Sequence, residues 1–169
     1  DTIANDSKGG MVLALERLFE LGHRNIALFT GGSMMSAGSS WRLQIMKDFC
    51  SNRNIFFSED LCVECDMSVS SLESFSQART AMRKFLSKDT PATAIFASND
   101  ILALAALHVA NEKGIKVPDE LSIIGMDGIL SGEISYPTLT TVEKNRSQIG
   151  SLAAKSLIEK IEAPVEWQT

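Results

Sequence analysis

The stretch TAIFASNDILAL, residues 93–104, indicates the fold of this chain. Residues 93–97 form a short apolar run, which is typical of a strand that is buried on both faces. Three polar residues, Ser98, Asn99 and Asp100, follow at once, and residues 101–113 then have the apolar spacing of a helix that Gly114 ends. The stretch therefore predicts a strand that leads directly into a helix.

The rest of the chain repeats this alternation of strand and helix. Further apolar runs predict strands at residues 26–30, 61–65, 121–126 and 139–142. Helical spacing predicts helices at residues 11–21, 41–50, 72–86 and 149–161. Because strands that are apolar throughout need cover on both faces, the pattern predicts an α/β fold with a parallel sheet flanked by helices on both faces.

Length and composition narrow the function classes. The chain has 169 residues with 44% hydrophobic content, which suits one globular domain, and its formal net charge is -5. No cluster of Lys and Arg is long enough to follow a phosphate backbone, so the chain by itself is expected to bind nucleic acid poorly. No apolar segment reaches the ~18 residues of a membrane span. Because the sequence begins at Asp1 without an initiator Met, we expect a piece of a longer protein.

The three cysteines do not predict a disulfide framework or a metal site. Cys50, Cys62 and Cys65 are an odd number in a chain of this size, which favours a reducing compartment. Cys62 and Cys65 have CxxC spacing, but they fall in a predicted strand, where residues three apart point to opposite faces. The two histidines, His23 and His108, are far apart and accompany no nucleophile motif, so the sequence indicates no catalytic triad.

Polar residues follow two of the predicted strands at the point where each strand ends. Ser98 or Asn99 can cap the next helix, and Asp100 suits the positive end of its dipole. Asp127 follows the strand at residues 121–126, where Gly128 and Ile129 do not indicate a helix, so capping explains Asp127 less well. In open α/β sheets the carboxyl edge of the strands is where ligands bind. Asn99 thus has two interpretations, a helix cap or a ligand-binding group.

Arg42 adds a third polar group after the strand at residues 26–30. It is either a solvated residue of the helix at residues 41–50 or part of the same edge as Asn99 and Asp127. A guanidinium fork, an amide and a carboxylate together offer several donors and acceptors. We therefore predict that these three residues line one edge of the sheet and bind a small polar molecule.

Four stretches resemble one protein family, in order and over nearly the whole chain. They are GHRNIALFTGG (residues 22–32), PATAIFASNDILALAAL (residues 91–107), GIKVPDELSIIGMDG (residues 114–128) and PTLTTV (residues 137–142). Together they resemble the effector-binding region of the lac-repressor/galactose-repressor (LacI/GalR) family of bacterial transcription regulators. The resemblance implies a periplasmic-binding-protein-like (type I) fold of two α/β lobes, with a small effector in the cleft between them.

The resemblance also implies roles for individual residues. Arg42, Asn99 and Asp127 match the family's effector-binding arginine, asparagine and aspartate, and Ser98 and Asp100 fall where they would cap the helix and support the site. Two further cleft positions are implied, Met67 and Lys144.

Three positions depart from the family's pattern. Ile45 stands where a glycine usually follows the arginine, Gly128 replaces a frequent second acid, and Met67 replaces a ring-stacking aromatic. A sugar is the expected effector class, and a purine-like effector is the other class that the family uses.

The resemblance further implies how the domains and partners are organised. Residues 1–141 are expected to form the C-terminal lobe, and residues 142–169 to return to the N-terminal lobe. The helix-turn-helix headpiece of the family is not in this sequence, so operator DNA is expected to be contacted only through that missing part. We expect a cytoplasmic homodimer without a cofactor, which uses the helices at residues 72–86 and 101–113 and the loop after Asp127.

Two alternatives remain at this point. The first is a periplasmic solute-binding protein of the same fold, which shares the cleft but never contacts DNA. The second is an enzyme in which Asp100 and Asp127 hold Mg²⁺ for phosphoryl transfer, although the sequence has no P-loop and no activated nucleophile.

Overall fold

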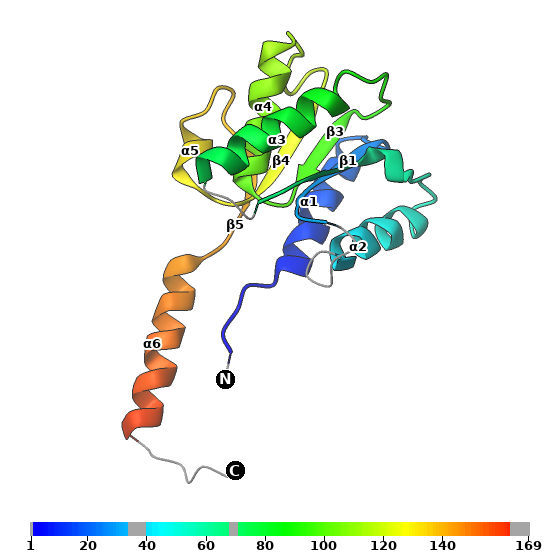
Figure 1. Ribbon diagram of the computed structural model, residues 1–169. Helices are drawn as coiled ribbons and strands as arrows, with labels where there is room; N and C mark the ends of the chain where they lie inside the picture. Colours follow the sequence, from blue (N-terminus) through cyan, green and yellow to red (C-terminus); the bar gives the residue numbers. More distant parts are fainter. Residues whose placement is uncertain (1, 34–39, 68–70, 163–169) are drawn as a thin grey trace.

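The centre of the molecule is a five-stranded sheet in the order β2-β1-β3-β4-β5. The computed structural model describes residues 2–33, 40–67 and 71–162. The strands are β1 (Ile26–Gly31), β2 (Cys62–Cys65), β3 (Ala94–Ala97), β4 (Ser122–Asp127) and β5 (Thr140–Glu143). All four neighbouring pairs are parallel, which confirms the predicted fold class (Figure 1).

Helices connect the strands and cover both faces of the sheet (Figure 1). They are α1 (Ser7–Glu20), α2 (Ser40–Ser51), α3 (Ser71–Phe85), α4 (Asp100–Glu112), α5 (Leu130–Glu133), α6 (Arg146–Glu162) and the short 3-10 helix η1 (Glu59–Leu61). The expected longer helices are all present, with ends shifted by up to four residues. The sequence analysis missed η1 and α5, since one turn of helix has too few residues to show a period.

Alternate residues of each central strand face the two helical layers. In β1, Ala27 and Phe29 pack with the core formed by α3 and α4, whereas Ile26 and Leu28 pack with the core formed by α1 and α2. Each of these four side chains is buried. Burial on both faces explains why the strand reads as a continuous apolar run rather than as an alternating one.

A histidine connects the amino-terminal ends of β3 and β4. The ring of His23 lies 2.9 Å from the hydroxyl oxygen of Thr93 and 3.0 Å from that of Ser122, through its two different nitrogens. Thr93 precedes β3 and Ser122 begins β4, so the ring bridges segments that are far apart in the sequence. Burial lowers the pKa of His23, because desolvation disfavours the charged ring.

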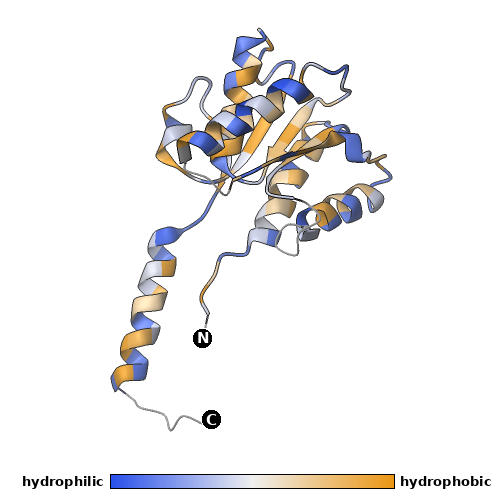
Figure 2. Cartoon of the chain, in the orientation of Figure 1, coloured by the Kyte–Doolittle hydropathy of each residue, from blue (hydrophilic) through white to orange (hydrophobic). Residues whose placement is uncertain are grey.

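Helix α6 differs from the other long helices because none of its residues is buried. It runs away from the sheet and its covering helices, and apolar and polar residues alternate along it (Figure 2). Its large exposed apolar side chains are Leu152, Leu157, Ile158 and Ile161. Within the described residues, no helix combines the length and apolarity that a membrane crossing requires.

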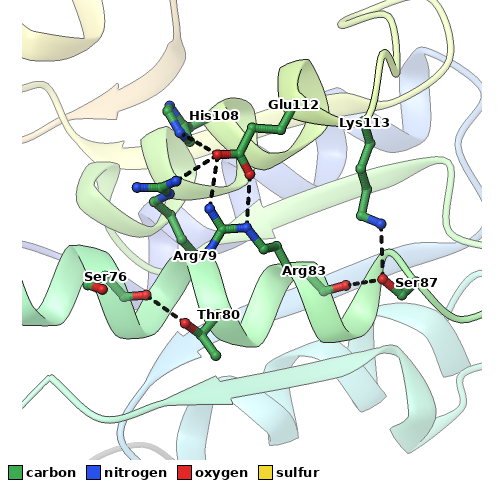
Figure 3. Close-up of polar contacts among 8 residues, drawn as sticks. All are labelled: Ser76, Arg79, Thr80, Arg83, Ser87, His108, Glu112 and Lys113. Atoms are coloured by element: carbon green, nitrogen blue, oxygen red, sulfur yellow. Dashed lines mark hydrogen bonds and ion pairs between the residues drawn. The ribbon is translucent and has the colours of Figure 1, made fainter.

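Helices α3 and α4 are joined at the surface by an ionic cluster around Glu112 (Figure 3). Its carboxylate accepts hydrogen bonds from Arg79 (2.6 Å) and from two nitrogens of Arg83 (both 2.9 Å). The Nε2 atom of His108 lies 2.9 Å from the same carboxylate. The hydrogen bond from Arg83, followed by that from Arg79, lowers the pKa of Glu112 to about 2.

We expect this cluster to make the stability of the fold depend on pH in acid. Because the folded-state pKa of Glu112 lies below its unfolded value, its contribution is present above pH ~4.5 and is lost as the pH falls towards 2. A Glu112→Gln variant should therefore melt below the wild type at pH 7 and match it near pH 2. Thermal unfolding between pH 2 and pH 7 measures this, with Glu159→Gln, whose Lys155 partner is 3.8 Å away, as the control. A constant difference across that range would contradict the assignment.

Candidate ligand-binding edge

The carboxyl ends of the parallel strands form one edge of the sheet, and two predicted site residues lie there. Asn99 follows β3 and Asp127 ends β4, and these strands are neighbours. Continued along both strands, the register that pairs Ile95 with Ile123 brings Asn99 opposite Asp127. The structure thus places Asn99 and Asp127 at the carboxyl ends of two adjacent strands.

Asn99 is the N-cap of α4. Its side-chain carbonyl oxygen accepts a hydrogen bond of 2.9 Å from the backbone N–H of Leu102. The capping interpretation is therefore correct for this oxygen. The cap also fixes the orientation of the side chain, so its amide nitrogen remains as the group that can donate to a ligand. Ser98, just before it, is buried, and its backbone N–H donates to the carbonyl of Phe29 over 2.8 Å.

Asp100 is a fully buried carboxylate below this edge. One oxygen accepts a hydrogen bond of 2.9 Å from the backbone N–H of Ile129, and the other accepts one of 2.5 Å from the hydroxyl of Thr141. The side chain thus joins the first turn of α4 to the turn after β4 and to β5. Gly125 leaves the necessary space, because a Cβ there would collide with the carboxylate of Asp100.

Asp127 lies in a strained backbone conformation. Its φ is 136°, which is unfavourable for a residue with a side chain, and Gly128 follows with φ 67°. The Asp127 carboxylate forms an ion pair with the ammonium group of Lys144, the residue after β5. The side chains of both residues are less than one third exposed. Two of the predicted site residues are therefore in direct contact.

Arg146, the first residue of α6, is a contact that the sequence analysis missed. Its guanidinium donates to the carbonyl of Asp127 over 2.8 Å and to that of Gly128 over 3.5 Å. One signal pointed to it: a cation is disfavoured at the positive end of a helix dipole, so an arginine at that place needs another partner.

Met67 follows β2, and Arg42 lies in α2, the helix that comes after β1 in the chain. The side chain of Met67 lies directly against Gly31, the last residue of β1, where a Cβ would collide with it. Arg42 is in the first turn of α2, with its guanidinium carbon 4.5 Å from the centre of the Trp41 ring. Burial lowers the pKa of Arg42, which nevertheless remains charged at neutral pH. That Arg42 joins Asn99 and Asp127 around one ligand stays a prediction.

The two aspartates do not form the magnesium site considered as an alternative. Both oxygens of Asp100 accept hydrogen bonds from protein donors, and Asp127 is paired with a lysine. Across residues 2–33, 40–67 and 71–162, no three His, Cys, Asp or Glu side chains are grouped as metal ligands.

The CxxC cysteines point to opposite faces of β2, as predicted. Cys62 packs with the core of α1 and α2, and Cys65 packs with the core of α3 and α4. Burial raises the pKa of each thiol to about 11. Both are free thiols and stay protonated at neutral pH, so they serve as small core residues.

An open parallel sheet with a polar carboxyl edge defines an α/β ligand-binding lobe. The chain belongs to the periplasmic binding protein-like domain family, whose model matches residues 15–167. It is 30% identical over 161 residues to the HTH-type transcriptional repressor PurR of Histophilus somni, a match that covers 95% of this chain and 46% of PurR. It is 35% identical over 149 residues to the HTH-type transcriptional regulator DegA of Bacillus subtilis, covering 88% of this chain and 42% of DegA.

Solved structures agree with these relatives. The complex of the transcriptional regulator CelR with cellobiose superposes with a TM-score of 0.78 at 29% identity, covering 95% of this chain and 47% of CelR. The resemblance to the effector-binding region of the LacI family is therefore confirmed. The chain spans just under half the length of the curated relatives described here. These relatives are transcription regulators, so they fit the regulator interpretation and not the solute-binding or enzyme alternatives.

Proposed function

We propose that this chain is the effector-sensing part of a cytoplasmic, DNA-binding transcription regulator that binds a small polar molecule and does not catalyse a reaction. A sugar is the first candidate effector. The similar structure of CelR is a complex with cellobiose, and another relative is named a ribose operon repressor. A purine is the second candidate. The effector would bind Arg42, Asn99 and Asp127, with Lys144 and Met67 beside it, in a cleft between this lobe and another.

The observation that carries this proposal is the polar edge itself. Asn99 presents an amide that its cap holds in place, and Asp127 presents a carboxylate on the next strand. A hydroxyl group can donate to the carboxylate while it accepts from the amide or from Lys144. Neighbouring hydroxyls of a sugar, or the N–H and carbonyl edge of a purine, meet that requirement.

A thermal-shift screen with cellobiose, D-ribose, hypoxanthine and guanine tests the proposal. A ligand that binds only the folded state raises the melting temperature, and the rise grows with ligand concentration above Kd. We expect at least one compound to do so in the wild type and to lose its effect in Asp127→Ala. If all four compounds and their close analogues left the melting temperature unchanged in the two-lobe protein, the proposed ligand classes would be wrong.

We also propose that residues 142–169 contact a second lobe, which would complete the cleft. The support is that α6 has no buried residue and carries four large exposed apolar side chains. An apolar surface of this kind is typical of a region that another surface covers. Hydrogen exchange in the two-lobe protein should show α6 better protected than in this chain alone, and equal protection in both would contradict the assignment.

A homodimer is the proposed assembly, formed through α3, α4 and α5. A cavity of about 300 Å³ lies there, lined by Phe75, Leu104, Leu107, His108, Asn111, Ser135 and Tyr136. On α3, on α5 and in the residues that follow α5, the side chains of Leu72, Leu130, Ile134 and Tyr136 are each more than two thirds exposed. Sedimentation velocity of Tyr136→Asp should show a shift towards monomer, with Phe56→Asp, another largely exposed aromatic residue, as the control. A wild type that is monomeric at all concentrations would contradict this assembly.

A further inference from the structure

The segment that joins β5 to α6 contacts the turn at Asp127 in two different ways. Lys144 forms an ion pair with the carboxylate of Asp127. Arg146 donates to the backbone carbonyls of Asp127 and Gly128. The backbone N–H of Lys144 also lies 3.4 Å from the carbonyl of Asp127. One short segment therefore meets the side chain and the backbone of the same residue.

The backbone at Asp127 needs such support. A φ of 136° is costly for any residue with a Cβ, and it persists only where surrounding contacts favour it. Other contacts hold the turn that follows: the backbone N–H of Ile129 donates to Asp100, and the N–H of Gly128 lies 3.4 Å from the Thr141 hydroxyl. These contacts hold the residues after Asp127, whereas Lys144 and Arg146 contact Asp127 itself.

We propose that Lys144 and Arg146 are positioning residues, which together hold the Asp127 carboxylate and its strained backbone in the ligand-binding arrangement. This inference rests on the proposed function, since it concerns the same site. It assigns Arg146 a role, and it makes Lys144 the counter-ion of Asp127 before a ligand arrives. A ligand hydroxyl that bonds to Asp127 must then share the carboxylate with Lys144 or displace it.

The contacts of Lys144 and Arg146 also connect Asp127 to the first turn of α6. Because α6 has no buried residue, its first turn is fixed to this lobe through β5 and through the contacts of Lys144 and Arg146. A change in the position of Asp127 therefore reaches the start of α6 directly, because Arg146 is itself the first residue of that helix.

Hydrogen exchange of the full chain, followed by mass spectrometry without any ligand, tests the inference. We expect the Lys144→Met and Arg146→Met variants each to raise exchange at residues 128–132 and in the first turn of α6 about tenfold. Lys144→Arg should restore the wild-type rate, because the charge returns. Lys155→Met, which removes an exposed lysine of α6, is the matched control and should change neither region.

A double-mutant cycle separates positioning from general stabilisation. Glycine tolerates a positive φ, so in an Asp127→Gly background the turn no longer needs to be held. Arg146→Met should then have little further effect on exchange. An equal acceleration in both backgrounds, or wild-type exchange in Arg146→Met, would overturn the proposal. Because these measurements use no ligand, they can fail while a screened compound still binds, and a failed screen leaves their outcome unaffected.

Discussion

Replacing Asp100 by alanine is expected to lower the free energy of unfolding by about 2–6 kcal/mol, because two buried hydrogen-bond donors lose their acceptor. Asp100 is fully buried, and its two oxygens accept from the N–H of Ile129 and the hydroxyl of Thr141. Alanine would leave both donors without an acceptor, and each unmade bond costs about 1–3 kcal/mol. Urea denaturation of the full chain measures the change.

Asp100→Asn is the matched control for this prediction. Its side-chain oxygen can still accept from Ile129, and its amide can donate to the Thr141 oxygen, because a hydroxyl is also an acceptor. We expect a loss of about 1 kcal/mol, in the range of one typical hydrogen bond. Asp119→Ala, on the exposed surface, should have almost no effect. Equal losses in the alanine and asparagine variants would show that charge, rather than hydrogen bonding, is what Asp100 supplies.

The second large effect is expected on ligand binding, from Asn99→Asp. Aspartate caps a helix as well as asparagine does, so the bond to Leu102 and the stability of α4 should be retained. It lacks the amide donor, however, and it adds a second negative charge opposite Asp127. We expect the affinity for a compound found in the thermal-shift screen to fall about 10- to 100-fold, which is about 1.4–2.8 kcal/mol.

Asn99→Ala is the companion variant, because it removes the cap and the donor together. It should lose affinity and also about 1 kcal/mol of stability. Isothermal titration calorimetry and urea denaturation on the same samples separate the two roles. If Asn99→Asp bound the compound as tightly as the wild type, Asn99 would be a helix cap alone and the ligand site would lie elsewhere.

The sequence was sufficient to predict the fold class and the order of the strands and the longer helices. Apolar runs such as residues 93–97 predict strands because burial on both faces demands it. The polar residues Ser98 and Asn99 likewise predict a cap before α4, which the structure assigns to Asn99. These signals lie within a few residues of the element that they describe. The placement of Asn99 and Asp127 at strand ends could be predicted for the same reason.

Only the tertiary structure decided which of these groups touch. The ion pair of Asp127 with Lys144, the bond of Asp100 with Thr141 and the contact of Arg146 with Asp127 each join residues on different elements. Whether β4 lies beside β5 depends on the packing of the whole sheet, which no local pattern encodes. The sequence by itself determined which chemical groups stand at the ends of the strands, and the order of the strands determined which of those groups are neighbours.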